Sequence, residues 1–321
     1  TFIGIGAIDD FSVKAPDEFD AEQQATLDQV PIIDQRSTTL GLSWKRNYKN
    51  GKGFMMTALS TNRLENVFSR YEDNTTRTGT IFQNDSYEWE TKLRYQTTFY
   101  SDQWKWSSGF NIQQSSYQNN TIFNYYDIAY NTTLDFIKYG FFVKGSRKLF
   151  NDRMDLTLGL RTDADSYSTG SNLMDNLSPR IAFSYALTEN QQWKLNATAG
   201  RYFKIPTYTM LGFQNERSLF VNQEASYVRS DHFVAGLEYN VTPSSRFTLE
   251  GFVKNYSNYP VSVVDGVSLA NKGGGFEVLG NEEIVSEGTG QSSGLEFLFQ
   301  QKLSNNFYGV FAYTYFFSEF T

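Results

Sequence analysis

Apolar and polar residues alternate with a period of two along most of the chain. Between Arg180 and Leu187, the apolar side chains of Ile181, Phe183 and Tyr185 share one parity with Leu187, and mostly polar or small residues take the other. Successive side chains of a strand point to opposite faces of a sheet. The pattern therefore predicts strands with one apolar and one polar face.

About thirteen such strands follow one another, the first near residues 1–11 and the last near 306–320. Each has at least the roughly 9 to 11 residues that a strand needs to cross a bilayer. Short connections of turn-forming residues alternate with long polar ones. The short ones are 50–53, 101–103, 151–152, 189–191, 243–245 and 304–306, and the long ones lie near 12–34, 65–83, 118–131, 204–225 and 260–289, with a shorter example near 169–176.

This alternation of connections predicts a membrane barrel. In an antiparallel up-and-down array every second connection lies at the same end, and outer-membrane barrels have short periplasmic turns and longer extracellular loops. Charges also keep to one parity, since Leu156, Leu158 and Leu160 share a face while Asp155 and Arg161 share the other. A charge at the midplane of the lipid-facing side would cost about 2 to 4 kcal/mol. We therefore expect an all-β, antiparallel up-and-down segment of a transmembrane β-barrel.

Aromatic residues lie at the strand ends nearest the short turns, as an interfacial girdle requires. A soluble β-sandwich also alternates and could use such rings to cap its core, so it stays open as an alternative. A solenoid is less favoured, because the sequence has no fixed repeat period. The girdle residues are Trp44, Trp104, Trp106, Phe150, Trp193, Phe247 and Phe307.

One long connection contains a predicted short helix. Asp20 can cap its start, Gln23 stands at the capping-box position, and Val30 followed by Pro31 would end it. We expect a local addition to the loop and no separate domain.

Composition removes several classes of protein. No run of about 18 apolar residues could cross a membrane as a helix, and the net charge of −7 with a pI near 5.0 makes nucleic-acid binding improbable. The absence of Cys rules out thiolate metal sites, and we expect neither a metal nor a cofactor. The chain starts at Thr1 with no signal peptide, so we interpret it as a fragment.

The segment 177–206 resembles the barrel of the TonB-dependent receptors. Ser178-Pro179-Arg180 and Phe203-Lys204-Ile205-Pro206 match characteristic positions of that family, and the hairpins around 234–254 and 294–315 are similar to the ones that follow. The stretch 263–283 looks closest to the subgroup with an amino-terminal carboxypeptidase-regulatory-like domain. The clear resemblance covers about residues 177 to 320.

The resemblance implies a barrel of about 22 strands with a plugged lumen. Thirteen strands cannot close it, so we expect residues 1–321 to be part of one barrel domain, without the plug, the TonB box and the first and final strands. It also implies uptake of a ligand such as a siderophore, a glycan or a peptide with TonB-derived energy. The implied partners are outer-membrane lipid, TonB through the absent plug, and a surface lipoprotein.

Two groups of residues are candidates for ligand contact. Arg161, Asp163 and Asp165 share a face at the loop end of a strand, where paired carboxylates could hold Ca²⁺ or a cationic ligand, although a solvated ladder of lumen charges is the favoured explanation. Aromatic residues crowd two long loops, as in a sugar- or siderophore-binding surface, but such rings also serve loop packing. These aromatic candidates are Tyr125, Tyr126, Tyr130, Tyr208 and Phe213.

Three other functions stay open at this point. A passive porin would share the alternation and the girdles without needing a plug. An outer-membrane enzyme would need a catalytic histidine, but the only one, His232, falls on the lumen parity as an ordinary polar residue. A soluble all-β binding module would fold without detergent. We favour the active importer and expect no enzymatic activity.

Overall fold

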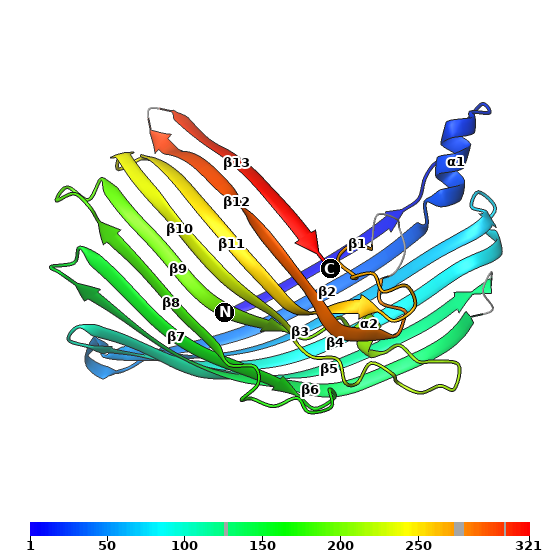
Figure 1. Ribbon diagram of the computed structural model, residues 1–321, viewed down its shortest axis with the longest axis horizontal. Coiled ribbons are helices and arrows are strands. Elements are labelled where there is room, and N and C mark those ends of the chain that lie inside the picture. The colour runs from blue at the N-terminus through cyan, green and yellow to red at the C-terminus, as the bar shows by residue number, and fades with distance from the viewer. Residues whose placement is uncertain (125–127, 273–278, 305) are drawn as a thin grey trace.

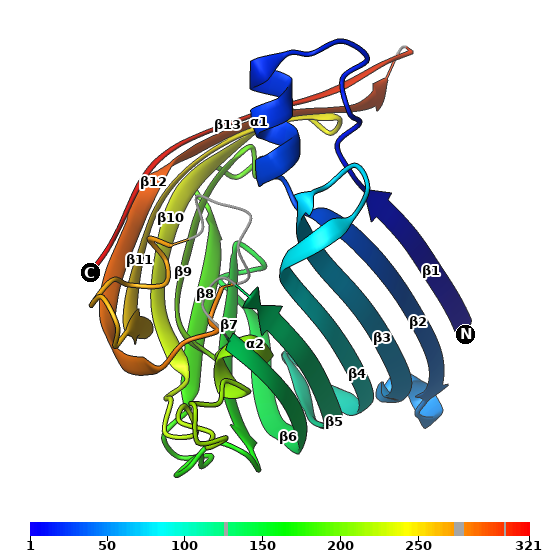
Figure 2. The same ribbon diagram turned by 90° about the vertical axis from the view of Figure 1, so that its right-hand side faces the viewer.

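The computed structural model describes residues 1–124, 128–272, 279–304 and 306–321. They form one antiparallel sheet of thirteen strands, in which each strand pairs with its neighbours in the sequence. The sheet curves into an open trough (Figures 1 and 2). The predicted all-β, up-and-down fold and the number of strands are confirmed. The strands are β1 (Phe2–Phe11), β2 (Ile32–Asn47), β3 (Gly53–Asp73), β4 (Thr78–Ser101), β5 (Trp104–Phe123), β6 (Ile128–Leu149), β7 (Met154–Asp165), β8 (Ser178–Ala186), β9 (Trp193–Lys204), β10 (Val228–Thr242), β11 (Ser245–Ser262), β12 (Ile284–Ser304) and β13 (Phe307–Phe320).

Helical structure is confined to the connections. Helix α1 (Ala21–Gln29) follows β1, and its first turn is capped as predicted, because the Asp20 side chain accepts hydrogen bonds from the backbone N–H groups of Glu22 and Gln23. A 3₁₀ turn, η1 (Lys49–Gly51), joins β2 to β3, and α2 (Tyr208–Leu211) lies between β9 and β10. No helix in the described part of the chain is long and apolar enough to cross a membrane.

The short connections lie at one end of the sheet, as predicted, but two predicted long loops are wrong. Strand β3 continues to Asp73, β4 already begins at Thr78, and β5 continues to Phe123. The segments near 65–83 and 118–131, which were expected to be loops, are therefore mostly the ends of hairpins. The polar residues there satisfy their backbone groups by cross-strand pairing, which a polar composition does not reveal. The long connections that remain are those after β1, β7, β9 and β11.

The two faces of the sheet separate as the alternation predicts. Helix α2 lies on the concave side (Figure 2), where its Tyr208 hydroxyl contacts Glu90 and Ser115, so this side carries the polar parity. On β7, Arg161 hydrogen-bonds to Asn111 of the same side. The leucines of β7 therefore face outward, and Leu158 is 45% exposed there. The convex side is the lipid-facing one.

The aromatic girdle is also present on the convex side. Trp193, Tyr239, Phe247 and Phe299 are successive register partners across β9 to β12, at the end of the sheet with the short turns. The rings of Trp193 and Tyr239 stack with centroids 4.4 Å apart, and those of Phe247 and Phe299 with centroids 4.7 Å apart. These amphipathic and apolar rings mark the periplasmic edge of the apolar band.

Candidate functional site

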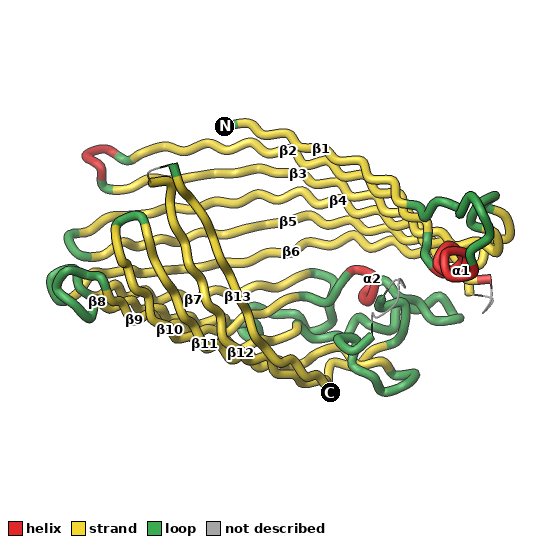
Figure 3. Tube along the Cα trace, turned by 90° about the horizontal axis from the view of Figure 1, so that it is seen from above, coloured by secondary structure: helices red, strands yellow, loops and turns green. Residues whose placement is uncertain are grey.

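The loop between β9 and β10 folds into the trough instead of extending away from it (Figures 2 and 3). Pro206 cannot continue the β-ladder as a donor, and α2 begins two residues later. Its apolar side chains join a buried cluster on the inner wall, and this burial fixes the loop against β5 and β6. The cluster consists of Tyr117, Leu134, Phe136, Tyr208, Met210, Leu211, Ala225, Leu269 and Ile284.

Tyr208 is the polar anchor of this loop. Its ring packs at right angles to Phe136, with centroids 5.4 Å apart, and against Tyr117 at 5.9 Å. Its hydroxyl bonds to Ser115 Oγ at 3.1 Å and to the ion pair of Glu90 and Lys138, whose charged atoms lie 3.0 Å apart. Burial raises the pKa of Tyr208, so the hydroxyl stays protonated. The loop is thus held by both apolar and hydrogen-bonding contacts.

The connection between β7 and β8 meets the same cluster through Tyr167. Its ring lies between Phe136 and Phe220, with centroids 5.7 Å and 6.1 Å away, and its hydroxyl donates to the carbonyl oxygen of Leu211 at 2.8 Å. Burial raises the pKa of Tyr167 to about 12. One tyrosine therefore joins the loop after β7 to the loop after β9.

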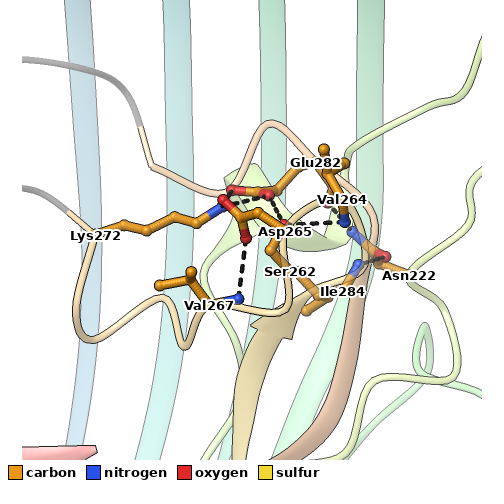
Figure 4. A network of polar contacts seen from close by, with 8 residues as sticks. All are labelled: Asn222, Ser262, Val264, Asp265, Val267, Lys272, Glu282 and Ile284. Carbon is orange, nitrogen blue, oxygen red and sulfur yellow. Dashed lines mark hydrogen bonds and ion pairs between the residues drawn. The ribbon is translucent and has the colours of Figure 1, made fainter. Parts of the chain in front are cut away.

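The loop between β11 and β12 is joined to the β9–β10 loop by a polar network (Figure 4). Lys272 Nζ lies 2.9 Å from an Asp265 carboxylate oxygen and 2.8 Å from one of Glu282. Asn222 crosses between the loops: its Nδ2 donates to the backbone carbonyl of Glu282 at 2.9 Å, and its Oδ1 accepts from the N–H of Ile284 at 3.0 Å. Three loops therefore form one packed layer inside the trough, which we call the inner roof (residues 166–177, 205–227, 263–272 and 279–283).

Arg161 and Asp163 form an ion pair on the lumen side, with Nε 2.6 Å from Oδ2. Asp165 is 4% exposed and does not join them, because its carboxylate accepts from the backbone N–H groups of Tyr167 at 2.8 Å and Ser168 at 2.6 Å. The two carboxylates thus do not converge. In the part of the chain that the structure describes, no group of three or more acidic, His or Cys residues could hold a metal ion. The role of Arg161, Asp163 and Asp165 as ligand contacts stays a prediction.

Among the aromatic candidates, Tyr130 and Phe213 come together at the edge of the inner roof. Their rings meet at right angles with centroids 5.9 Å apart, and the Tyr130 hydroxyl donates to Asn281. Tyr208 is only 8% exposed, so its ring serves the packing described above. Tyr125 and Tyr126 lie outside the described residues. Binding of a ligand by any of these five aromatic residues stays a prediction.

His232 lies on the lumen side as predicted, but it has neighbours that the sequence did not indicate. Its ring is 4.6 Å from that of Tyr202, which in turn lies under the guanidinium of Arg180 at 4.2 Å. Nε2 is 2.7 Å from Ser230 Oγ. The pairing of β8, β9 and β10 brings Arg180, Tyr202 and His232 into this stack. Parity in the sequence can place the three side chains on one face of the sheet, but it cannot show that they are in contact.

A polar hollow of about 250 Å³ lies within the inner roof, between the loop after β7 and the chain that leads into β10. Backbone, hydroxyl and amide groups line most of it, which suits hydrogen bonding to a polar ligand group. Tyr227 forms part of its wall, and burial together with the nearby Asp165 charge raises the pKa of this tyrosine. Sequence reasoning missed this hollow and the residues of the polar network, because loop-to-loop contacts have no periodicity.

Comparison with known proteins agrees with this architecture. Solved structures with the same fold include the pyoverdine outer membrane receptor FpvA from Pseudomonas aeruginosa PAO1, which is 11% identical, aligns with a TM-score of 0.66 and covers 92% of this chain and 46% of its own. The copper transporter OprC is 13% identical, aligns with a TM-score of 0.65 and covers 90% of this chain and 47% of its own. The outer membrane transporter YddB from Escherichia coli aligns over 99% of this chain and 45% of its own (11%, 0.59). The chain thus spans a little under half the length of these structures.

A search of curated protein sequences finds no match. The profile of the family described as "TonB dependent receptor-like, beta-barrel", by contrast, matches residues 6–321, which is nearly the entire chain. The resemblance seen in the sequence near residues 177 to 320 is therefore confirmed and extends further toward the amino terminus. With its trough of thirteen strands, its lipid-facing convex side and its inner roof of loops, this chain belongs to the β-barrel family of the TonB-dependent receptors of the outer membrane.

Proposed function

We propose that this chain forms part of the barrel of an active importer, which captures a ligand at the cell surface and moves it inward with energy delivered by TonB. The observation that carries this proposal is the family match over residues 6–321. The inner roof supports it as well, since loops folded into part of the concave side narrow the path for the free diffusion that a porin provides. The plug and the TonB contact would lie outside this chain.

Ligand capture is assigned to the inner roof and its edge. Tyr130 and Phe213 offer aromatic edges and Arg161 and Asp163 offer charge near the outer end of the trough. The neighbouring structures are named for pyoverdine and copper. A siderophore, a glycan or a peptide fits aromatic rings beside hydrogen-bonding groups, and a surface lipoprotein could help to present the larger of these ligands.

Uptake assays can test the proposal. The full-length gene product is expressed in outer membranes, and accumulation of iron-loaded siderophores, copper ions and fluorescent oligosaccharides is measured with and without a functional TonB. We expect one class to accumulate only when TonB is functional. Accumulation of small solutes of every class regardless of TonB would instead identify a passive channel.

A variant locates the ligand contact. Replacing both members of the edge pair, Tyr130→Ala with Phe213→Ala, should lower ligand binding to whole cells without changing the amount of folded receptor. The matched control is Tyr95→Ala with Phe110→Ala, a stacked ring pair on the lipid-facing side of β4 and β5. Equal loss of binding in both double variants would contradict a ligand contact at the inner roof.

A further inference from the structure

The convex side carries a shallow apolar depression across β8 to β13. Its floor is made of small residues, because Ala197, Ala235 and Gly251 are register partners on β9, β10 and β11. Its volume of about 740 Å³ lies within the roughly 300–1,000 Å³ of small-molecule sites. Larger apolar side chains surround the floor: Ile181, Phe183, Phe233, Val253, Leu295 and Phe317.

A group of three charged residues lies on the same convex side, directly beyond the depression. Arg201 follows Ala199 by two residues on β9, and Asp231 precedes Phe233 by two residues on β10. Asp231 Oδ1 accepts from Arg201 Nε at 2.7 Å, and Asp231 Oδ2 accepts from Arg229 Nε at 3.0 Å. Two guanidinium groups thus share one carboxylate, and the group carries a net positive charge.

The height of these charges places them at the outer edge of the membrane. Arg201 lies eight residues beyond Trp193 of the periplasmic girdle, which at roughly 3.4 Å per residue and a tilt of roughly 40° is about 21 Å along the membrane normal. The apolar band of an outer-membrane barrel is about 25 Å tall. The arginines therefore reach the level at which lipid headgroups begin.

We propose that a phosphate-bearing lipid of the outer leaflet binds here, with an acyl chain in the depression and its phosphate on Arg201 and Arg229. The planar guanidinium fork matches the geometry of phosphate oxygens. Each guanidinium has five N–H donors, and the bonds to Asp231 use only some of them. The apolar depression and the cationic edge are continuous, so one amphipathic molecule satisfies both.

The test measures retention of a defined lipid by the full-length gene product in detergent. Native mass spectrometry compares lipid A with the same lipid from which the phosphates have been removed. We expect the phosphorylated form to be retained in preference by roughly tenfold, as charge-assisted hydrogen bonds to one phosphate imply. Added inorganic phosphate should not displace it, since the acyl chain contributes to binding.

Variants separate the two parts of the site. The change Arg201→Gln with Arg229→Gln should remove the preference for phosphate, whereas Asp231→Asn should increase it, because it removes the competing carboxylate. Gly251→Leu should lower retention of both lipids by filling the depression. A Cβ at Gly251 meets only Leu295 Cδ2 at 3.5 Å and a backbone oxygen at 4.0 Å, so the strand tolerates it.

The control is Arg63→Gln, a more exposed arginine on the convex parity of β3, a strand that is not among those lining the depression. It should retain lipid A as the unmodified protein does. Equal retention of the two lipids, loss of the preference in Arg63→Gln, or weaker retention in Asp231→Asn would each overturn the proposal. Displacement by inorganic phosphate would show a simple anion site and overturn the lipid assignment.

Discussion

The two walls of the trough differ in how the chain is folded above the membrane. On one wall, β3 to β6 have 21, 24, 20 and 22 residues. The β3–β4 and β5–β6 hairpins, which we call the tall hairpins, extend the sheet far beyond the apolar band. On the other wall, β7, β8 and β9 have 12, 9 and 12 residues, and the chain leaves the sheet to form the inner roof. Figure 3 shows the long strands on one side and the folded loops on the other.

The side chains explain this difference. In the tall hairpins, Asn84 donates to Asn119 and Thr121 across two strands at 2.7 Å, so amides and hydroxyls satisfy one another along the sheet. In the inner roof, the side chains of Leu211 and Met210 are apolar and are buried against the wall. Polar residues therefore extend the sheet, and apolar residues draw the chain inward. We expect the two walls to respond to different substitutions.

The largest effect is expected from Leu211→Ala, which should release the inner roof. Leu211 is fully buried at 0% exposure, and removing such a side chain costs about 2–5 kcal/mol. Hydrogen exchange of the backbone amides of residues 205–227 should accelerate by at least roughly thirtyfold, the lower end of that range. Exchange near the tip of the β3–β4 hairpin should not change, because neither of these two strands contributes a side chain to the buried cluster.

The matched control for this variant is Leu219→Ala. It removes the same atoms from the same loop, but Leu219 is 57% exposed and should hardly alter exchange. Equal acceleration by both variants would show that the loop is held by something other than burial. The comparison of the two walls would then lose its physical basis.

A smaller effect is expected on the other wall from Asn84→Ala. Asn84 is 2% exposed, and loss of its two donated hydrogen bonds should cost about 1–3 kcal/mol of local stability. Amides near the tip of the β3–β4 hairpin should exchange faster while residues 205–227 stay protected. The control, Asn120→Ala, changes an exposed amide on β5, and a response equal to that of Asn84→Ala would contradict the polar ladder.

Much of the membrane band could be predicted from the sequence, because its physics is periodic. Parity alone places the leucines of β7 on one face, and the position of Trp193 at a strand end next to a short turn predicts its place in the girdle. The capped helix at Asp20 was predicted for a similar reason, since capping depends on residues two or three positions apart. Local rules are sufficient where the contacts are local or repeat with the strand.

The inner roof could not be predicted in the same way. Tyr208 was identified as an aromatic loop residue, but its partners Glu90 and Lys138 lie 118 and 70 residues away in the sequence. The extent of the tall hairpins was missed because polar strands outside the membrane resemble loops in composition. The contacts of the inner roof and of the tall hairpins are both decided by tertiary packing. Both regions lie above the apolar band, where we expect the ligand to bind.

The smallest effect is expected from Lys272→Gln in the polar network, because Asp265 is well exposed to solvent. The Lys272 ammonium and the backbone N–H of Val267 lower the pKa of Asp265 below its ordinary 3.8. A carboxylate with a lowered pKa stabilises the folded loop above its ordinary pKa, and this contribution is lost as pH falls through the lowered value. Acid should therefore loosen the loop after β11 only below about pH 3.8, and Lys272→Gln should weaken that dependence.

Spin labels can measure this loosening, because the chain contains no cysteine of its own. Labels at Val264→Cys and Leu219→Cys, two exposed positions on the linked loops, report the distance between them by electron paramagnetic resonance. The distance distribution should broaden on acidification, and in Lys272→Gln it should already be broader at neutral pH. Lys302→Gln, near the periplasmic end of β12, serves as the control and should match the unmodified protein. An identical acid response in all three proteins would show that Asn222 and the apolar cluster alone join the loops, and that the inner roof is held by burial without help from charge.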